Sequence, residues 1–110
     1  NLDELVGYSQ CQKTYFIRLK SSAKTRKIPF SIKIKDIYKL LVKQDFKCSL
    51  SDVPIDIDGK KNTASIDRID SGKGYTKKNV QWVHVDINRA KGAMSQLEFI
   101  ELCKKVVAKN

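Results

Sequence analysis

Residues 63–92 constrain the fold of this chain more than any other segment. Apolar and polar residues alternate at a period of two in two short runs, 63–69 and 79–84, as is typical of β-strands with one buried face. A glycine-rich turn separates the runs, and a short helix is expected from about Asp86 to a stop at Gly92. The segment therefore predicts a strand, a loop, a second strand and a helix in immediate succession.

Helices are expected on both sides of this unit. An amphipathic pattern predicts one helix over 10–26, broken before Pro29, and a second over 35–45. Ser95 and Glu98 fit a capping box at the start of a third. The buried stripe predicted for that last helix consists of Phe99, Leu102, Cys103 and Val106.

The charge of the chain is strongly positive and unevenly distributed. The 110 residues carry a net charge of +10, and residues 11–47 alone hold eleven Lys and Arg against two Asp. Such a concentration is typical of a surface that meets phosphates. The alternative is a solvated lysine-rich face that only keeps the chain soluble.

The cysteines and the hydropathy limit the compartment. Cys11, Cys48 and Cys103 are odd in number and widely spaced, which favours a reducing compartment over a disulfide framework. No apolar run approaches a membrane span, so no membrane partner is expected. The chain begins at Asn1 without a methionine, which leaves room for a targeting segment upstream.

Three polar residues give the central unit its chemistry: Asp67 on the first strand, Asn79 at the start of the second, and Asn88 on the helix. The surrounding motifs are Ile66-Asp67-Arg68-Ile69, Gly74-Tyr75 and Asn79-Val80-Gln81-Trp82-Val83, with eight residues between Asn79 and Asn88. In this order the chain resembles the HNH nucleases, the ββα-metal family. The resemblance covers the last sixty-odd residues well and the helices before Cys48 more loosely.

The resemblance implies an α+β fold and a single HNH endonuclease domain over 1–110. Its parts would be a basic helical part (1–47), a ββα-metal core (48–94) and a C-terminal helix (95–110) that packs against the core. The implied function is a metal-dependent DNA endonuclease of phage or bacterial type. It would hydrolyse phosphodiester bonds of double-stranded DNA in the cytoplasm of a bacterial or phage-infected cell.

The resemblance also implies the metal ligands, Asp67 from the strand and Asn88 from the helix. Hard ions prefer oxygen ligands and retain several waters, so two protein ligands suffice for Mg²⁺, with Mn²⁺ as the alternative. Asn79 would hold the loop through hydrogen bonds to backbone groups. It is implied as part of the catalytic site without touching the metal.

Arg68 departs from the family pattern, which usually has a general-base histidine there. A guanidinium stays protonated, so Arg68 suits a grip on phosphate better than proton transfer. The proton acceptor is then His84, Tyr75 or a hydroxide bound to the metal. His84 lies four residues before Asn88 and would share its face if the helix extended that far back.

A second role is open to His84. Zinc-bearing relatives hold their fold with two Cys-x-x-Cys pairs, where this chain has Cys48 to Ser51 and His84 to Ile87. One ligand from each pair does not make a structural zinc site, so none is expected, and His84 is then a packing remnant. A calcium loop over 56–59 is rejected for lack of downstream ligands, and a turn is predicted there.

Phosphate contacts are predicted mainly from the basic helices. The candidate DNA-binding residues are Lys20, Lys24, Arg26, Lys27, Arg89 and Lys91. One alternative function is a DNA-binding module that keeps the HNH fold with impaired catalysis, for which Arg68 would mark the loss. A more distant one is a basic RNA- or ribosome-associated protein. The cleavage site, nicking against double-strand cutting and the oligomeric state are not determined by these patterns.

Overall fold

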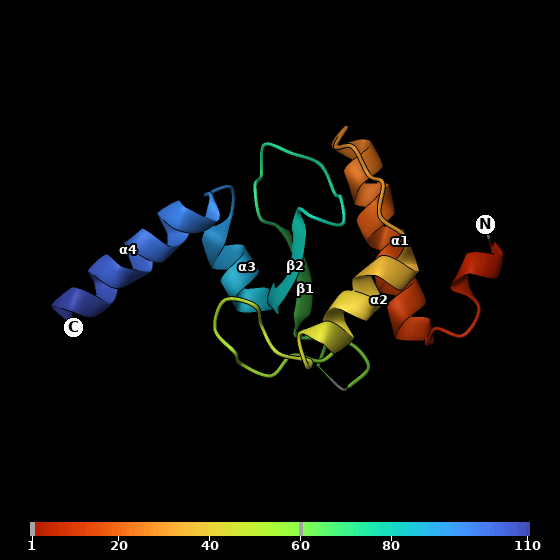
Figure 1. The fold of residues 1–110 in the computed structure, drawn as a ribbon, viewed down its shortest axis with the longest axis horizontal. Helices are drawn as coiled ribbons and strands as arrows, with labels where there is room; N and C mark the ends of the chain where they lie inside the picture. The colour runs from red at the N-terminus through yellow and green to blue at the C-terminus, as the bar shows by residue number, and fades with distance from the viewer. Residues whose placement is uncertain (1, 60) are drawn as a thin grey trace.

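The computed structural model describes residues 2–59 and 61–110 and has an α+β fold. The elements in chain order are a 3-10 helix η1 (Leu2–Leu5), α1 (Gln10–Thr25), α2 (Ile34–Lys43), β1 (Ala64–Arg68), β2 (Val80–His84), α3 (Val85–Lys91) and α4 (Gln96–Lys109). Figure 1 shows α1 and α2 on one side of the two strands, α3 on the other side, and α4 extending away from the rest. The predicted order of strand, strand and helix is observed, with every boundary within two residues.

The two strands form an antiparallel pair in which Ile66 lies opposite Trp82 and Asp67 lies opposite Gln81. Side chains alternate between the faces of a sheet, so the two faces differ in character. One face, on the side of α1 and α2, carries the apolar pair Ile66 and Trp82. The other face, on the side of α3, carries the polar pair Asp67 and Gln81.

Trp82 lies at the centre of the core and is fully buried. Its ring centroid is 5.4 Å from that of Tyr15 and 5.6 Å from that of Tyr38, and its Nε1 donates to the carbonyl of Ile37 at 2.6 Å. A buried indole therefore keeps its hydrogen bond while its ring packs. The buried apolar side chains are Phe16, Ala23, Ile32, Ile34, Ile37, Tyr38, Leu41, Cys48, Ile55, Ile57, Ala64, Ile66, Tyr75, Val80, Trp82 and Val83.

Tyr15 joins α1 to the open edge of β1. Its hydroxyl oxygen accepts a hydrogen bond from the backbone N–H of Ile66 at 2.7 Å. Burial raises the pKa of the Tyr15 phenol, so the group stays neutral at ordinary pH. The contact closes a strand edge that would otherwise need water.

Capping explains where the helices begin. Ser95 and Glu98 form the predicted capping box of α4, and Ser9 and Gln12 form another at α1 that the sequence interpretation did not include. At the other end of α3, Gly92 has φ of +54°, a conformation that favours glycine, and the predicted stop at this residue is confirmed.

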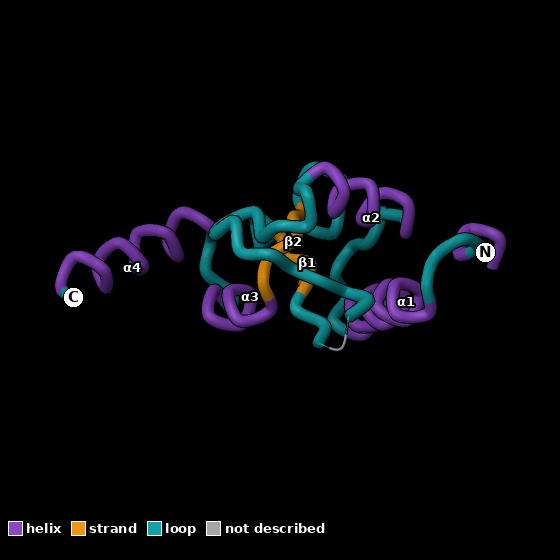
Figure 2. Tube along the Cα trace, turned by 90° about the horizontal axis from the view of Figure 1, so that it is seen from below, coloured by secondary structure: helices purple, strands orange, loops and turns teal. Residues whose placement is uncertain are grey.

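The prediction that the C-terminal helix packs its apolar stripe against the core is wrong. No side chain of α4 is buried, and Leu102 and Val106 are 48% and 57% exposed. The sheet face nearest to α4 is already covered by α3, so α4 makes few contacts with the body. It faces Leu50, Ser51 and Ile87 across a groove, and Gln96 at its start accepts a hydrogen bond from Gln81. Tube and ribbon views agree that α4 stands clear of the body (Figures 1 and 2).

Candidate functional site

Asn79 fastens the loop that joins β1 to β2. Its Oδ1 accepts from the backbone N–H of Asp70 at 2.9 Å, and its Nδ2 donates to the carbonyls of Asp70 (3.0 Å) and Gly74 (2.9 Å). An amide provides both an acceptor and donors at this position, whereas a carboxylate would place a charged acceptor against two carbonyls. Asn79 makes the backbone contacts expected of it.

The same loop lies between α1 and α3. On one side, the backbone N–H of Tyr75 donates to the carbonyl of Pro29 at 2.8 Å. A Cβ on Gly74 would lie 2.6 Å from that same carbonyl oxygen, so only glycine permits this approach. On the other side, Ser71 Oγ donates to the carbonyl of Ala93 at 2.9 Å, just beyond α3. The loop therefore connects the turn after α1 with the end of α3.

Arg68 points into this loop. One terminal nitrogen of its guanidinium donates to the carbonyls of Ser71 (2.9 Å) and Lys73 (2.8 Å). The guanidinium carbon lies 5.3 Å from the centroid of the Tyr75 ring, within range of a cation–π contact. In this arrangement Arg68 stabilises the loop, and its contact with phosphate stays a prediction.

Asp67 and Lys91 form a buried ion pair. Their exposed fractions are 5% and 1%, and Nζ of Lys91 lies 3.0 Å from Oδ1 of Asp67. The other carboxylate oxygen accepts from Nε2 of Gln81 at 3.0 Å, and Nζ also donates to the carbonyl of Arg68 at 3.1 Å. These additional hydrogen bonds offset part of the cost of removing two charges from water.

Asn88 reaches the same strand one helical turn before Lys91. Its Nδ2 donates to Ser65 Oγ at 2.6 Å and to the carbonyl of Ile66 at 3.2 Å. Residues three apart on a helix share a face, and residues two apart on a strand share a face. Thus α3 sets Asn88 beside Ser65 and Lys91 beside Asp67, and both predicted metal ligands lie where α3 meets β1.

The donor types at this junction suit a hard divalent ion. Asp67 has a carboxylate, and Oδ1 of Asn88 accepts no hydrogen bond from the part of the chain that the structure describes. Within that part, no three His, Cys, Asp or Glu side chains gather as a metal site. Two protein ligands are compatible with Mg²⁺, because this ion usually keeps several of its waters. The Lys91 ammonium now neutralises Asp67, and a metal ion would have to take its place.

His84 is the N-cap of α3. Its Nδ1 accepts from the backbone N–H of Asp86 at 3.1 Å, which requires an unprotonated Nδ1. It pairs with Ala64 in the sheet and therefore projects from the face opposite to that of Asp67. The helix begins at Val85, so His84 does not share a helical face with Asn88.

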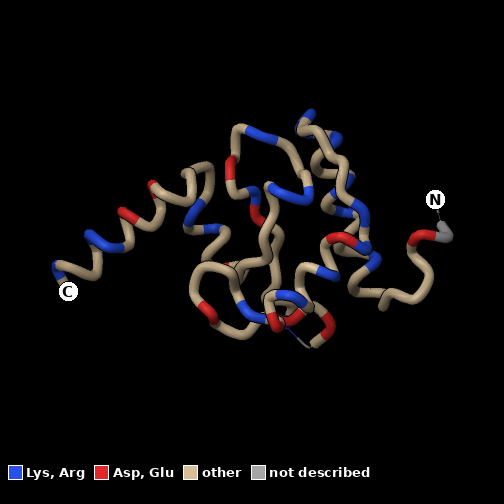
Figure 3. Tube along the Cα trace, in the orientation of Figure 1, with Lys and Arg blue, Asp and Glu red and all other residues tan. Residues whose placement is uncertain are grey.

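The predicted DNA-binding residues at the end of α1 are exposed. They are Lys20, Lys24, Arg26 and Lys27. Figure 3 shows this basic segment close to the basic residues of the loop between β1 and β2. The contact of Tyr75 with Pro29 links these two segments. Their exposed basic residues together are called the positive surface below.

The structure separates the two basic residues predicted on α3. Arg89 is exposed, with a guanidinium nitrogen 4.0 Å from Asp86. Lys91 is buried against Asp67 and does not reach the surface, so the phosphate contact predicted for Lys91 is wrong in this conformation. A lysine on a short helix was expected to be solvated, and its burial follows from the packing of α3 on β1.

The turn after Cys48 is held by hydrogen bonds. The backbone N–H of Cys48 donates to the carbonyl of Val53, and that of Asp52 donates to the carbonyl of Cys48, at 2.8 and 2.9 Å. Ser49 ties the turn to β2, since its N–H donates to the carbonyl of Trp82 at 2.9 Å. The segment from Cys48 to Val53 is therefore fixed by its own backbone and by its link to β2.

Sequence interpretation missed three members of the site: Ser65, Gln81 and the Asp67 partnership of Lys91. Ser65 and Gln81 could have been found, because the period-two pattern already sets them on the same sheet face as Asp67. Gln81 also contacts a residue outside the sheet: its Nε2 donates a hydrogen bond to Oε1 of Gln96 at 3.0 Å. No pattern in the neighbouring sequence indicates that Lys91 is buried.

Comparison of the chain with family models, curated proteins and solved structures returned no match. Across residues 2–59 and 61–110, no helix combines the length and apolarity needed to cross a bilayer.

Proposed function

We propose that the protein is a metal-dependent endonuclease that hydrolyses phosphodiester bonds of double-stranded DNA through an HNH-type site. The observation that carries the proposal is the convergence of α3 and β1, which brings Asn88 and the buried carboxylate of Asp67 to one junction beside a loop fastened by Asn79. A fully buried acid on a two-stranded sheet contributes little to stability in itself. A role in chemistry is therefore the better explanation for an acid at this position.

In this proposal Asp67 and Asn88 hold the metal, Mg²⁺ or Mn²⁺. The bound ion supplies a Lewis acid for the scissile phosphate. Asn79 keeps the loop in position through its three side-chain hydrogen bonds. Arg68, the residue after Asp67, extends its side chain into that loop, where its positive charge would attract an approaching phosphate.

His84 has a positioning role in this scheme. Its Nδ1 caps α3, and its side chain lies on the sheet face away from Asp67. By fixing the start of α3, His84 determines the position along β1 at which Asn88 makes its contacts. Tyr75 is buried beneath Arg68 and likewise supports the loop.

The positive surface supplies the affinity for DNA. The exposed basic end of α1 is linked to the loop between β1 and β2 by Pro29 and Tyr75, and Ser71 of that loop donates to the carbonyl of Ala93 just beyond α3. A duplex bound to this surface through its phosphates would pass the loop and come next to the proposed site.

The test is cleavage of supercoiled plasmid with Mg²⁺, with Mn²⁺ and with EDTA. Cleavage is expected with either metal and not with EDTA. Asn88→Ala and Asp67→Asn should lower the rate on the order of a thousandfold, since a Lewis acid contributes several kcal/mol to the transition state. Asn88 is only half-buried, so its variant should fold even if Asp67→Asn is unstable.

Asp45→Asn is the matched control, because its side chain is 86% exposed and lies in the turn after α2, away from the proposed site. It should cleave like the wild type. Cleavage that survives EDTA, or that is equal in wild type and Asn88→Ala, would contradict the proposal. Circular dichroism of each variant separates loss of chemistry from loss of fold.

The ion pair of Lys91 with Asp67 favours one alternative, a DNA-binding module without catalysis. An ammonium in the cation position would then be a permanent replacement for the metal. This alternative predicts salt-dependent DNA binding with no cleavage under any metal condition. The same plasmid assay, run beside a binding titration, distinguishes the two functions.

A further inference from the structure

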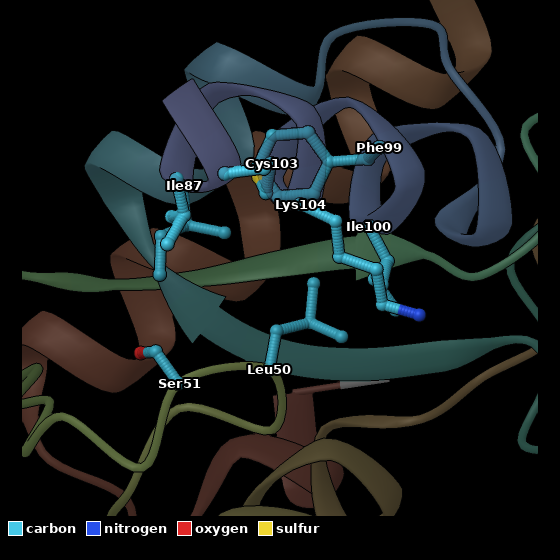
Figure 4. Close-up of a pocket in the computed structure, with 9 residues that line it drawn as sticks. Leu50, Ser51, Ile87, Phe99, Ile100, Cys103 and Lys104 are labelled. Carbon is cyan, nitrogen blue, oxygen red and sulfur yellow. The ribbon is translucent and has the colours of Figure 1, made fainter. Parts of the chain in front are cut away.

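The apolar side of α4 is left without a partner in the described part of the chain. A groove of about 590 Å³ lies between this helix and the body, with Leu50 and Ile87 on one wall. The opposite wall is formed by Phe99, Ile100, Cys103 and Val107 of α4 (Figure 4). The groove thus has an almost wholly apolar lining and opens to solvent.

The apolar surface continues around α4 beyond the groove. Leu102 and Val106 lie one turn apart on the same helix and are about half exposed. At 100° per residue, they and the groove residues form one stripe, and the charged residues begin along its edge next to Leu102 and continue around the far side. A 14-residue helix is marginal in water without packing of its apolar face. The stripe is therefore expected to pack against a partner.

The charges of α4 indicate which partner packs against this stripe. Two acids lie in its first half, Glu98 and Glu101, and three lysines in its second half, Lys104, Lys105 and Lys109. An antiparallel copy of the same helix would set the acidic half of each against the basic half of the other. A parallel copy would oppose like charges, which is unfavourable.

We propose that α4 pairs with α4 of a second copy of this chain, antiparallel about a two-fold axis near Cys103. With that centre, Phe99 faces Val107 of the second copy and Glu101 faces Lys105, so apolar and charged positions match at once. Such a self-complementary contact is the usual form of a closed dimer. The projection of α4 from the body leaves this approach unobstructed (Figures 1 and 2). The dimer is independent of the proposed nuclease activity.

The first test is sedimentation of the full chain across a range of concentrations. The wild type should dimerise, and Leu102→Lys with Val106→Lys should raise the dissociation constant by about tenfold or more, because each buries apolar area only in the dimer. Both side chains are exposed in the monomer, so the fold should persist. Val42→Lys is the matched control, since Val42 is 64% exposed on α2.

Charge exchange tests the antiparallel direction. Glu101→Lys and Lys105→Glu should each weaken self-association, and an equimolar mixture of the two variants should associate like the wild type. Oxidation with diamide should join Cys103 of the two copies, also in a Cys11→Ser background. A wild type that stays monomeric, a dimer that survives the Leu102/Val106 change, or a mixture that does not recover would each overturn the proposal.

Discussion

Replacing Lys91 with methionine removes the cation that neutralises the buried carboxylate of Asp67. Both side chains are almost completely inaccessible, and Gln81 is the remaining side-chain partner of the acid. Removing one member of a buried ion pair typically costs about 3–5 kcal/mol, a large part of the roughly 5–15 kcal/mol that holds a small domain together. Lys91→Met should therefore lower the free energy of unfolding by about that amount in the presence of EDTA.

A divalent metal should restore much of that loss if Asp67 and Asn88 are its ligands. Binding only to the folded state stabilises it by about 2.7 kcal/mol at a hundred times the dissociation constant. The gain should be larger in Lys91→Met than in the wild type, where the ion competes with the ammonium. Urea titrations followed by the fluorescence of Trp82, the only tryptophan, measure both quantities.

The control is the double variant Asp67→Asn with Lys91→Met. Without either charge it should be more stable than Lys91→Met in EDTA, and metal should give it no added stability. Equal metal effects in the single and double variants, or none in Lys91→Met, would refute the assignment of Asp67 as a ligand. This readout does not depend on cleavage.

Three further predictions concern the surface, the loop and α4. Charge reversal of Lys20 and Lys24 should flatten the salt dependence of DNA binding, in which log K falls by roughly 0.9 per phosphate neutralised; an unchanged slope would move the DNA to another face. Gly74→Ala should lower stability in thermal melts by about 1–3 kcal/mol, because the added Cβ meets a backbone oxygen; no change would mean that the loop can shift. The pKa of Glu98 is lowered by the backbone N–H that it accepts at the cap, so its contribution is present above its unfolded pKa of about 4.3 and is lost as pH falls through the lowered value. Helicity of α4 should decline over that range, and Glu98→Gln should not share the decline.

Local patterns were sufficient for most of the fold. The period-two runs located β1 and β2, and Gly92 ended α3 where its positive φ permits. The backbone contacts of Asn79 were implied by the resemblance to the HNH nucleases, and they are observed. These features depend on neighbours close in sequence.

The misplaced features depend on distant contacts. The stripe on α4 was recognised, but amphipathicity tells only that a helix has an apolar face and not what covers it. Lys91 was predicted at the surface. Its burial could not be anticipated from neighbouring residues, because it requires both the packing of α3 on β1 and a carboxylate 24 residues away in sequence. His84 was related to Asn88 by spacing on the condition that the helix extended back to it; α3 begins at Val85, one residue after His84, so the condition is not met.

Under the proposed function, the internal ammonium of Lys91 has a consequence for how the protein would take up its metal. Small domains that use an ion to hold their fold unfold when a chelator removes it, because the free energy of binding the ion is what stabilises the folded state. Here the chain carries its own counter-charge, so the folded state exists before any ion arrives. If the proposed nuclease activity holds, metal scarcity would stop cleavage without unfolding the protein or exposing it to proteolysis, and activity would return when the ion is resupplied, with no refolding in between.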